Sequence, residues 1–399
     1  MLLLLSVALG NGQTTHVWIT RHALEHLPQG ELKQVLVDNE RQLLNGSMFP
    51  DGGYAFSPHH PYAETAHWEP FQDLYRDWIT LEHGPPFDAE GEQHAAFLMG
   101  MASHGMADQV FDSLYMERSK VYDAEQGWAS GASMDEATDV WWAHLTQPQQ
   151  PPERWVPSEV FTELYAQVGI EATAEDMENG QLLLGAAIDL VGFFSSNDEM
   201  LARYEADYPW ATQHLLDSVD VPGAPRCEGY LIALYWQDLW SRLNGQWGPL
   251  QVVDTLPQPG TSGLETDADT VESRLSIVFA RGLGEVGPEH FSVTAEGREL
   301  AVDVWLFYGG DSHVVHLLPQ QDWPENAEIT VTVKPELTDR YGLSFGESWG
   351  FTVSTRQAEP RGCSHAPGSF VLLSLLAFAG CRVLKIPSAV PSKSSGRSS

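Results

Sequence analysis

Residues 92–117 carry the feature that most restricts how this chain can fold. The segment has the composition of one helix, and His104, Asp108 and Asp112 follow one another at steps of four residues. In an α-helix this spacing places the three side chains on one face, about one turn apart. An imidazole and two carboxylates on one face can hold Zn²⁺ or a similar divalent ion. The same spacing fits a buried histidine bonded to a neighbouring aspartate, and this helix alone does not decide between the two.

The composition narrows the class of protein. The 399 residues are enough for two domains and tails, and a hydrophobic content of 43% permits a sizeable core. The formal net charge is −34, from 55 acidic and 21 basic residues. Nucleic-acid phosphates are bound through lysine and arginine, so this charge argues against a nucleic-acid partner and favours a soluble monomer. The three cysteines, Cys227, Cys363 and Cys381, match neither a disulfide scaffold nor a zinc finger, so any metal must be held by His, Asp or Glu.

The N-terminal region is rich in histidine, since nine of the 15 histidines lie at or before His104. Helices are expected over 14–45, with a break at 28–30, and over 64–78. The loop 45–53 between them is rich in helix breakers and holds Asp51, which fits either a ligand or base or an ordinary turn residue. We expect the side chains of His22, His26, His83 and His94 to lie on the surface. The histidines that lie near an aromatic residue or a carboxylate in the sequence are His16, His59, His60, His67 and His104.

The following region is also predicted to be helical. Residues 122–139 are rich in Gly, Ser and Asp, which predicts a long irregular segment that holds Asp135. The run 181–194 is apolar on most sides, which predicts a helix at the centre of the bundle. Residues 13–249 are therefore expected to form an α-helical domain. Its later helices are expected at 158–168, 174–194, 197–208, 211–218 and 227–244.

Beyond residue 249 the pattern changes from helical to alternating. Short strands at about ten-residue spacing predict a β-sandwich over 250–356. His313 and His316 lie an odd number of positions apart, so they should face opposite sides of one strand and serve a structural role. The strands are expected at 275–279, 291–294, 301–306, 313–317, 328–333 and 349–353.

Both ends of the chain resemble targeting segments. Residues 1–12 look like the apolar half of a signal peptide, without a positively charged start. Residues 357–399 contain an apolar run at 369–381 that is shorter than the roughly 20 residues of a membrane span. With Cys363 before it and basic residues after it, this run predicts a sorting or anchoring tail. The protein is therefore expected to be secreted or anchored at the cell surface.

Four stretches in the helical region resemble the zinc-dependent phospholipase C family, which includes the glycosylphosphatidylinositol-specific phospholipase D. They occur in the family's order and spacing, and together they are specific. The resemblance implies an α-helical bundle around a cluster of three zinc ions. The stretches are THVWITRHAL (15–24), MFPDGGY (48–54), ETAHWEPF (64–71) and AFLMGMASHGMAD (96–108).

Position by position, the resemblance implies metal ligands at His16, Asp51, His67 and His104. It makes Asp51 a ligand that also acts as catalytic base, and it makes Asp108 a bridging carboxylate. One zinc in the family is completed by the amine and carbonyl of the mature N-terminus, which processing near residues 10–13 would supply here.

The third metal position departs from the family. Where the family has a histidine one turn past the bridging aspartate, this chain has Asp112. Where it has a second histidine, four residues before the carboxylate Asp135, this chain has Gly131. Two to three zinc ions are therefore expected. The third position has only carboxylate ligands, so it suits Ca²⁺, Mg²⁺ or Mn²⁺ better than Zn²⁺, or it is empty.

The expected activity is metal-dependent hydrolysis of a phosphodiester, on a phospholipid head group at a membrane surface. The alternative is a surface adhesin with a degenerate metal site, in which the β-domain is a spacer. A nuclease of related fold would need basic residues to hold phosphates, and the charge argues against it. The β-region resembles bacterial Ig-like domains of the surface-layer type, and the tail resembles bacterial surface-sorting tails. Removal of 251–399 is expected to leave hydrolysis intact, and loss of hydrolysis would mean that the β-domain shapes the site.

Overall fold

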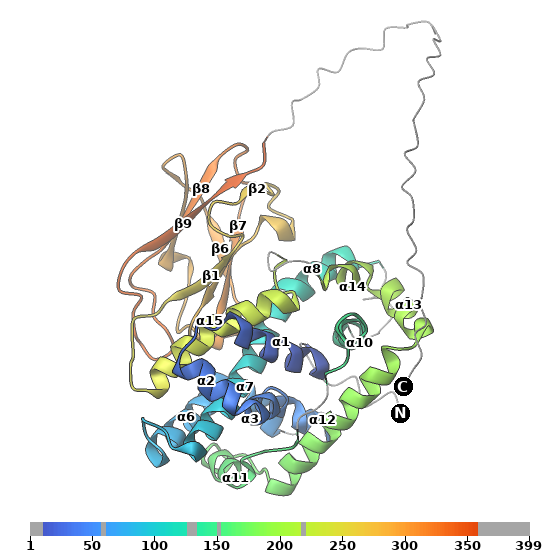
Figure 1. Ribbon diagram of the computed structural model, residues 1–399. Helices are drawn as coiled ribbons and strands as arrows, with labels where there is room; N and C mark the ends of the chain where they lie inside the picture. Colours follow the sequence, from blue (N-terminus) through green and yellow to red (C-terminus); the bar gives the residue numbers. More distant parts are fainter. Residues whose placement is uncertain (1–10, 57–60, 126–133, 150–152, 217–220, 358–399) are drawn as a thin grey trace, which may run out of the picture. The chain divides into compact units, whose positions relative to one another are not determined.

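The structure is a computed structural model that describes residues 11–56, 61–125, 134–149, 153–216 and 221–357 (Figure 1). Helices occupy the chain up to Leu243, and strands begin at Val252. The predicted signal-like residues 1–10, Gly131 and the tail 358–399 lie outside the described residues. Within the described ranges, no helix is both long enough and apolar enough to cross a membrane.

The predicted helices are present, and most end within a few residues of the expected positions. Polar side chains start several of them: the Asp88 carboxylate accepts the N–H of Gly91 at 2.8 Å, and Thr173 and Asp176 form a capping box. The helices are α1 (Gln13–His26), α2 (Glu31–Asp38), α3 (Glu40–Gly46), η2 (Phe49–Asp51), α4 (Gly52–Phe56), α5 (Pro61–Ala66), α6 (Glu69–Glu82), α7 (Ala89–Val110), the π-helix η3 (Phe111–Met116), α8 (Glu117–Tyr122), α10 (Met134–Thr146), α11 (Ser158–Gln167), α12 (Ala174–Phe194), α13 (Asp198–Asp207), α14 (Pro209–His214) and α15 (Pro225–Leu243).

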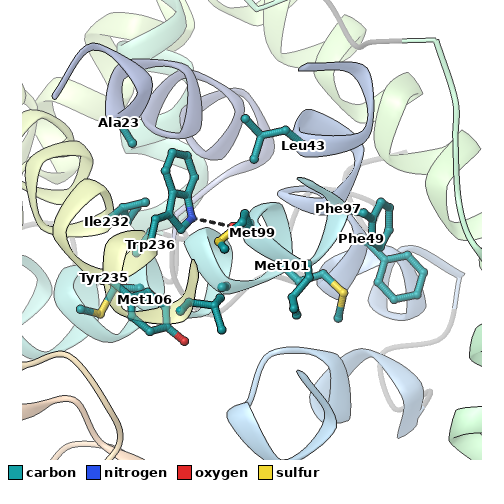
Figure 2. Close-up of a cluster of buried hydrophobic side chains, with 14 of the residues drawn as sticks. Ala23, Leu43, Phe49, Phe97, Met99, Met101, Met106, Ile232, Tyr235 and Trp236 are labelled. Carbon is teal, nitrogen blue, oxygen red and sulfur yellow. Dashed lines mark hydrogen bonds between the residues drawn. The ribbon is translucent and has the colours of Figure 1, made fainter. Parts of the chain in front are cut away.

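Helix α7 is the centre of the helical region. It packs against α3, α15, α6 and α1, and its residues are buried almost without a break from His94 to Val110. Figure 2 shows the core around it, where the Trp236 indole N–H donates to the Met99 carbonyl at 2.8 Å. A helix buried on all sides must be apolar nearly all round, which the composition of α7 satisfies.

The predicted helix over 92–117 is present but not uniform. Regular α-helix ends at Val110, and the chain continues through the π-helix η3 into α8. A π-turn has a wider repeat than an α-helix, so the four-residue spacing that relates His104 to Asp108 does not carry over to Asp112.

The prediction that 181–194 lies at the centre of the bundle is wrong. Helix α12 buries only one stripe, and on its other faces Leu182 is 57% exposed and Phe193 is 66% exposed. The central position is taken by α7, whose glycines and alanines allow closer packing than the leucines of α12. Some of the apolar side chains of α12 are therefore exposed to solvent.

The second region is a two-sheet β-sandwich, as expected. One sheet has the order β1-β3-β7-β6 and the other β2-β9-β8-β4-β5. The pairs are antiparallel except β2–β9, which is parallel. The strands are β1 (Val252–Leu256), β2 (Ser262–Leu264), β3 (Leu275–Phe279), β4 (Phe291–Ala295), β5 (Arg298–Glu299), β6 (Val302–Trp305), β7 (Val314–Pro319), β8 (Glu328–Val333) and β9 (Trp349–Thr355).

The two faces of the four-stranded sheet have different partners. Ile277 and Val315 point into the core of the sandwich. Val278 and Val314, on the alternate face, belong to the same apolar cluster as Phe97 and Trp236 of the helices. All five residues of β3 are buried as a result. Side chains of the helical region and of the sandwich therefore form one apolar cluster where the two regions meet, which a simple spacer domain would not need.

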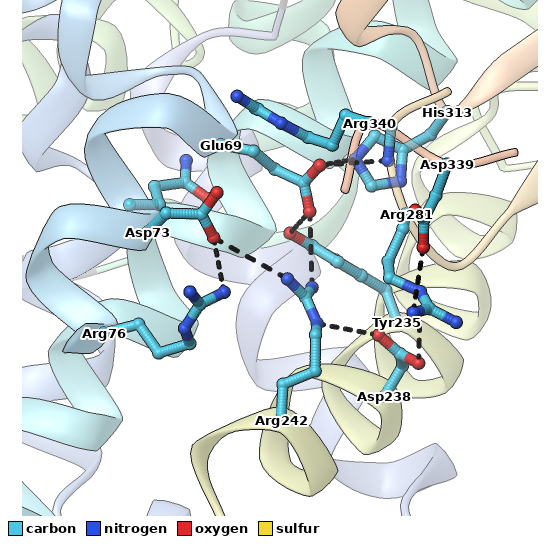
Figure 3. Close-up of polar contacts among 12 residues, drawn as sticks. Glu69, Asp73, Arg76, Tyr235, Asp238, Arg242, Arg281, His313, Asp339 and Arg340 are labelled. Carbon is cyan, nitrogen blue, oxygen red and sulfur yellow. Dashed lines mark hydrogen bonds and ion pairs between the residues drawn. The ribbon is translucent and has the colours of Figure 1, made fainter. Parts of the chain in front are cut away.

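A buried polar network joins the same two regions (Figure 3). Glu69 lies 3.3 Å from Arg242 and 3.6 Å from His313, and Arg281 lies 2.9 Å from Asp339. Each of these side chains is at least 95% buried. His313 thus has a structural role, as predicted, and so does His316, whose Nδ1 lies 2.8 Å from the Ser276 hydroxyl.

Candidate metal centre

Five of the predicted ligands meet in the middle of the helical region. His16 comes from α1, Asp51 from η2, His67 from the turn between α5 and α6, and His104 and Asp108 from α7. None is more than 5% exposed. Two triplets have ligand atoms that all lie within 4.8 Å of one another: His16 with Asp51 and His104, and His67 with His104 and Asp108.

The distances place three Nε2 atoms around two carboxylates. Asp108 lies 3.2 Å from His16, 3.3 Å from His104 and 3.6 Å from His67. Asp51 lies 3.3 Å from His67 and 3.7 Å from His104. The His67 and His104 Nε2 atoms are 3.1 Å apart. Asp108 is thus the carboxylate that all three imidazoles surround, as expected of a bridging ligand.

Backbone carbonyls fix how two of the imidazoles point. The Nδ1 of His104 lies 2.7 Å from the Ser47 carbonyl, and that of His67 lies 2.7 Å from the Ala63 carbonyl. A carbonyl oxygen accepts only, so Nδ1 carries a proton and Nε2 is the ring nitrogen that faces the cluster. This is how histidine ligands of metals are usually oriented.

Two glycines of α7 let other segments approach the helix closely enough. A Cβ on Gly100 would lie 2.1 Å from the Leu43 carbonyl oxygen, and one on Gly105 would lie 2.2 Å from that of His67. Any side chain at these positions would push away α3 or the turn that carries His67. Gly100 and Gly105 therefore allow α3 and the turn that carries His67 to lie close against α7.

Charge in the cluster is strongly coupled. Burial lowers the pKa of His104, but the carboxylates of Asp108 and Asp51 outweigh it and raise this pKa to about 10. Burial raises the pKa of Asp108, but His104 and His16 outweigh it and lower this pKa to about 2. The pKa of Asp51 is lowered in the same way by His104 and His67, whereas burial and then His104 lower that of His16. The carboxylates therefore stay ionised at neutral pH and attract a cation.

The residues present fit a metal. Among the described residues, the buried side-chain atoms without a hydrogen bond include His16 Nε2, Asp51 Oδ1, Asp108 Oδ2 and Asp112 Oδ1. Buried polar groups are normally satisfied, so four such atoms in one region indicate a missing partner. Nitrogen and carboxylate ligands of this kind suit Zn²⁺.

The other two predicted ligands lie apart from these triplets. Asp112 is 1% exposed and accepts a hydrogen bond from the Tyr308 hydroxyl of the sandwich. Burial and the charge of Asp108 raise its pKa to about 7. Asp135 was expected in an irregular segment, but it lies in the first turn of α10. Neither residue belongs to a described triplet, and their role as ligands stays a prediction.

Some residues at the cluster escaped prediction. Gln13 donates a hydrogen bond to Asp51. The Asn11 backbone N–H donates to Asp108 at 3.2 Å, and the Asn11 amide donates to the fully buried Glu228 of α15 at 2.9 Å. Asp139 accepts the backbone N–H of Thr15 at 2.8 Å. Asn11 thus lies beside Asp108, although the sequence places it in the signal-like segment 1–12.

The four histidines predicted to lie on the surface, His22, His26, His83 and His94, are outside the cluster. One of them, His94, is buried. His94 is 5% exposed and lies 2.6 Å from the Tyr75 hydroxyl, packed against Trp155. The aromatic residues around it bury it, and burial followed by His83 lowers its pKa to about 4. His59 and His60 lie outside the described residues.

A cavity of about 260 Å³ opens beside Asp51. Its lining is polar at Gln13, Asp51, Tyr54 and carboxylates of α10, and it is apolar along α12. This apolar wall comes mainly from α12, and Ala55 of α4 also lines the cavity. The α12 residues are Leu183, Leu184, Ala186, Ala187, Leu190 and Val191.

Comparison with known proteins agrees with the resemblance at the ligand-bearing stretches. Residues 15–111 match the family model of zinc dependent phospholipase C. Over 115 residues the chain is 34% identical to the phosphatidylinositol-glycan-specific phospholipase D of Bos taurus and 30% identical to that of Homo sapiens. Each alignment covers 27% of this chain and only 14% of the relative.

The comparison with solved structures does not establish the class of the sandwich. The surface-layer protein SbsC aligns with 82% of this chain at 11% identity, but the TM-score of 0.22 is too low to support a shared fold. The Ig-like class of the sandwich therefore stays a prediction. The predicted resemblance of the helical region is confirmed: residues 15–111 are similar to zinc dependent phospholipase C and to the phosphatidylinositol-glycan-specific phospholipases D.

Proposed function

We propose that this protein hydrolyses phosphodiester bonds in phospholipid head groups with the help of divalent metal ions, at or outside the cell surface. The proposal rests on one observation: the cluster of predicted ligands and a partly apolar cavity share the residue Asp51. Five buried ligand side chains converge on one point, and Asp51, one of the five, also lines the cavity with the apolar wall. A purely structural bundle needs neither feature.

His16, Asp51, His67, His104 and Asp108 would hold the ions. Ions bound there would make an attacking water more acidic and stabilise charge on the phosphate. Gln13 fixes one oxygen of Asp51, and the other oxygen makes no hydrogen bond among the described residues. That oxygen is placed to orient the attacking water and take its proton.

The apolar wall favours a lipid over a soluble phosphodiester. A phosphate beside Asp51 would place the rest of the substrate along α12, where apolar groups gain about 25 cal/mol for each Å² removed from water. The exposed Leu182 and Phe193 extend this apolar character to the outer surface of the same helix. This arrangement suits an enzyme that works at a membrane surface.

The test uses the full chain. Purified protein is dialysed without chelator, its zinc content is measured, and it is incubated with phospholipid vesicles while phosphomonoesters and free alcohols are quantified. We expect two or more zinc equivalents and hydrolysis that chelation stops. Asp51→Asn should lower the rate by about 10²–10⁴-fold, whereas the control Asp38→Asn, on the exposed end of α2, should not change it.

The identity of the products also separates the cleavage types. C-type cleavage gives diacylglycerol and a water-soluble phosphomonoester of the head group, whereas D-type cleavage gives phosphatidic acid and the free head-group alcohol. Bound zinc without hydrolysis of any phospholipid would favour the alternative, a surface-binding protein with a structural metal site. Absence of bound zinc, even after zinc is added, would contradict both the metal centre and the proposed activity.

A further inference from the structure

The sandwich contributes a side chain that contacts the predicted ligand Asp112. Tyr308 follows strand β6, and its hydroxyl donates a hydrogen bond to Asp112 Oδ2, 196 residues away along the chain. Tyr308 lies far outside residues 15–111, which match the family model. The contact therefore connects the sandwich to the helical region beside the predicted ligands.

Tyr308 is held firmly in this position. Its ring packs against Trp68, next to the predicted ligand His67, with ring centroids 4.7 Å apart. Its backbone N–H donates to the Ser312 hydroxyl at 3.1 Å. The preceding Phe307 packs against the apolar cluster of α10, α13 and α14 and lies under the Lys120 ammonium at 5.5 Å. Because these contacts fix Tyr308, its hydroxyl can hold the Asp112 carboxylate in one orientation.

One carboxylate oxygen of Asp112, the partner of Tyr308, makes no hydrogen bond among the described residues. Asp112 is 1% exposed, and its Oδ1 makes no hydrogen bond within the described part of the chain. Tyr308 occupies only Oδ2, so the carboxylate is oriented but not satisfied. A buried, oriented carboxylate oxygen that makes no hydrogen bond is suited to coordinate a metal ion.

We propose that Tyr308 is a positioning residue for a further divalent ion, because it holds Asp112 with the second carboxylate oxygen presented to that ion. The sandwich is then part of the metal centre and not a spacer. The ion would be one that accepts oxygen ligands, such as Mn²⁺, Ca²⁺ or Mg²⁺. Hydrogen-bond partners of this kind typically change metal affinity by about 10–100-fold. The inference rests on the proposed metal centre but concerns only its Asp112 position.

The test compares Tyr308→Phe with Tyr341→Phe in the full chain. Tyr341 is a matched control, because its hydroxyl also crosses between the two regions, to Asp73 at 2.8 Å, but lies away from the ligand cluster. Metal-free protein is titrated with Mn²⁺ and separately with Zn²⁺, and bound ions are counted by elemental analysis. In Tyr308→Phe we expect the dissociation constant of one ion to rise about 10–100-fold while the others are unchanged. In Tyr341→Phe we expect no change.

Asp112→Asn provides a second approach to the same pair and keeps the shape of the side chain. It should weaken the same single ion, and adding Tyr308→Phe to it should cause little further loss, because both changes act on one ligand. Equal metal affinity in Tyr308→Phe and wild type would overturn the proposal. So would an equal loss in Tyr308→Phe and Tyr341→Phe, which would assign the effect to the interface. Either result leaves zinc-dependent hydrolysis by the wild type as a separate question.

Discussion

The carboxylate of Glu69 accepts a hydrogen bond of 2.9 Å from the backbone N–H of Gly282, which joins helix α6 to the sandwich. The other carboxylate oxygen lies 3.3 Å from the Arg242 guanidinium. Glu69 stands two residues after His67, so the segment that carries a predicted ligand is fastened to the second region.

This contact predicts that Glu69 is important for folding. Glu69→Ala would remove one of the carboxylates that pair with Arg242, which is 3% exposed and also lies 2.9 Å from Asp238. Loss of one member of a buried ion pair typically costs about 3–5 kcal/mol. Urea unfolding should therefore show a large fall in the free energy of unfolding for Glu69→Ala. Glu82→Ala, on the exposed end of the same helix, is the control and should stay within about 0.5 kcal/mol of wild type.

The same contacts change the expectation for truncation. Removal of 251–399 would expose the apolar residues of the helices that now pack on β1, β3 and β7. We expect the truncated chain to lose cooperative thermal unfolding and to bind less zinc. A truncated chain that unfolds at the temperature of the full protein, with the same zinc content, would show that the sandwich is only a spacer.

His104→Ala should abolish metal binding. The imidazole takes part in both triplets, so neither would keep its ligand set. His94→Ala is a matched control, because it makes the same change on the same buried helix, away from the cluster. Both variants should be less stable than wild type, but only His104→Ala should fail to retain zinc by elemental analysis. Zinc retention by both would mean that the ligands are assigned wrongly.

The pKa of His104 predicts how pH acts on the metal-free protein. This pKa is raised from the ordinary 6.5 to about 10, so the stabilisation is complete below pH 6.5 and is lost as the pH rises through 10. With a chelator present, the free energy of unfolding should fall between pH 6.5 and 10, and this fall should be smaller in His104→Gln. Zinc needs the unprotonated imidazole, so the stabilisation gained from added zinc should increase over the same range. A zinc effect that is independent of pH would contradict the predicted role of His104.

The apolar wall of the cavity predicts a defined change in lipid kinetics. Leu183→Trp should fill part of the 260 Å³ beside Asp51. We expect a higher KM for long-chain phospholipid with little change for a small, water-soluble phosphodiester. Leu182→Trp, the same substitution at the neighbouring and 57% exposed position, should leave both unchanged. Equal loss on both substrates in Leu183→Trp would indicate damage to the metal centre instead.

Local patterns were enough to predict much of this structure. The strands β3 and β8 have the predicted bounds because two-residue alternation directly reflects the pleat of a sheet. His104 and Asp108 come together because four residues make about one helical turn. The contributions of His16, Asp51 and His67 could be expected only through the resemblance, since no local spacing relates them to α7.

The rest depends on contacts between distant parts of the chain. Tyr308 lies 196 residues from Asp112, and Glu228 lies 217 residues from Asn11. No periodic pattern carries that information. The position of α12 was mistaken for a related reason: its composition is apolar enough for a central helix, but only packing decides that α7 takes this place. The π-turn at Asp112 has no distinctive sequence signal, so the change that it makes in the position of Asp112 relative to His104 and Asp108 could not be predicted.

The shared core also has an evolutionary consequence. Leu256 and Val278 of the sandwich rest on the same apolar cluster as Ile232 and Leu239 of α15. A recombination event that divided the gene between the codons for residues 244 and 251 would give two products, each with an apolar surface exposed to solvent. We therefore expect the two segments to be inherited together, and builders of chimeric enzymes should treat residues 11–357 as a single exchangeable cassette.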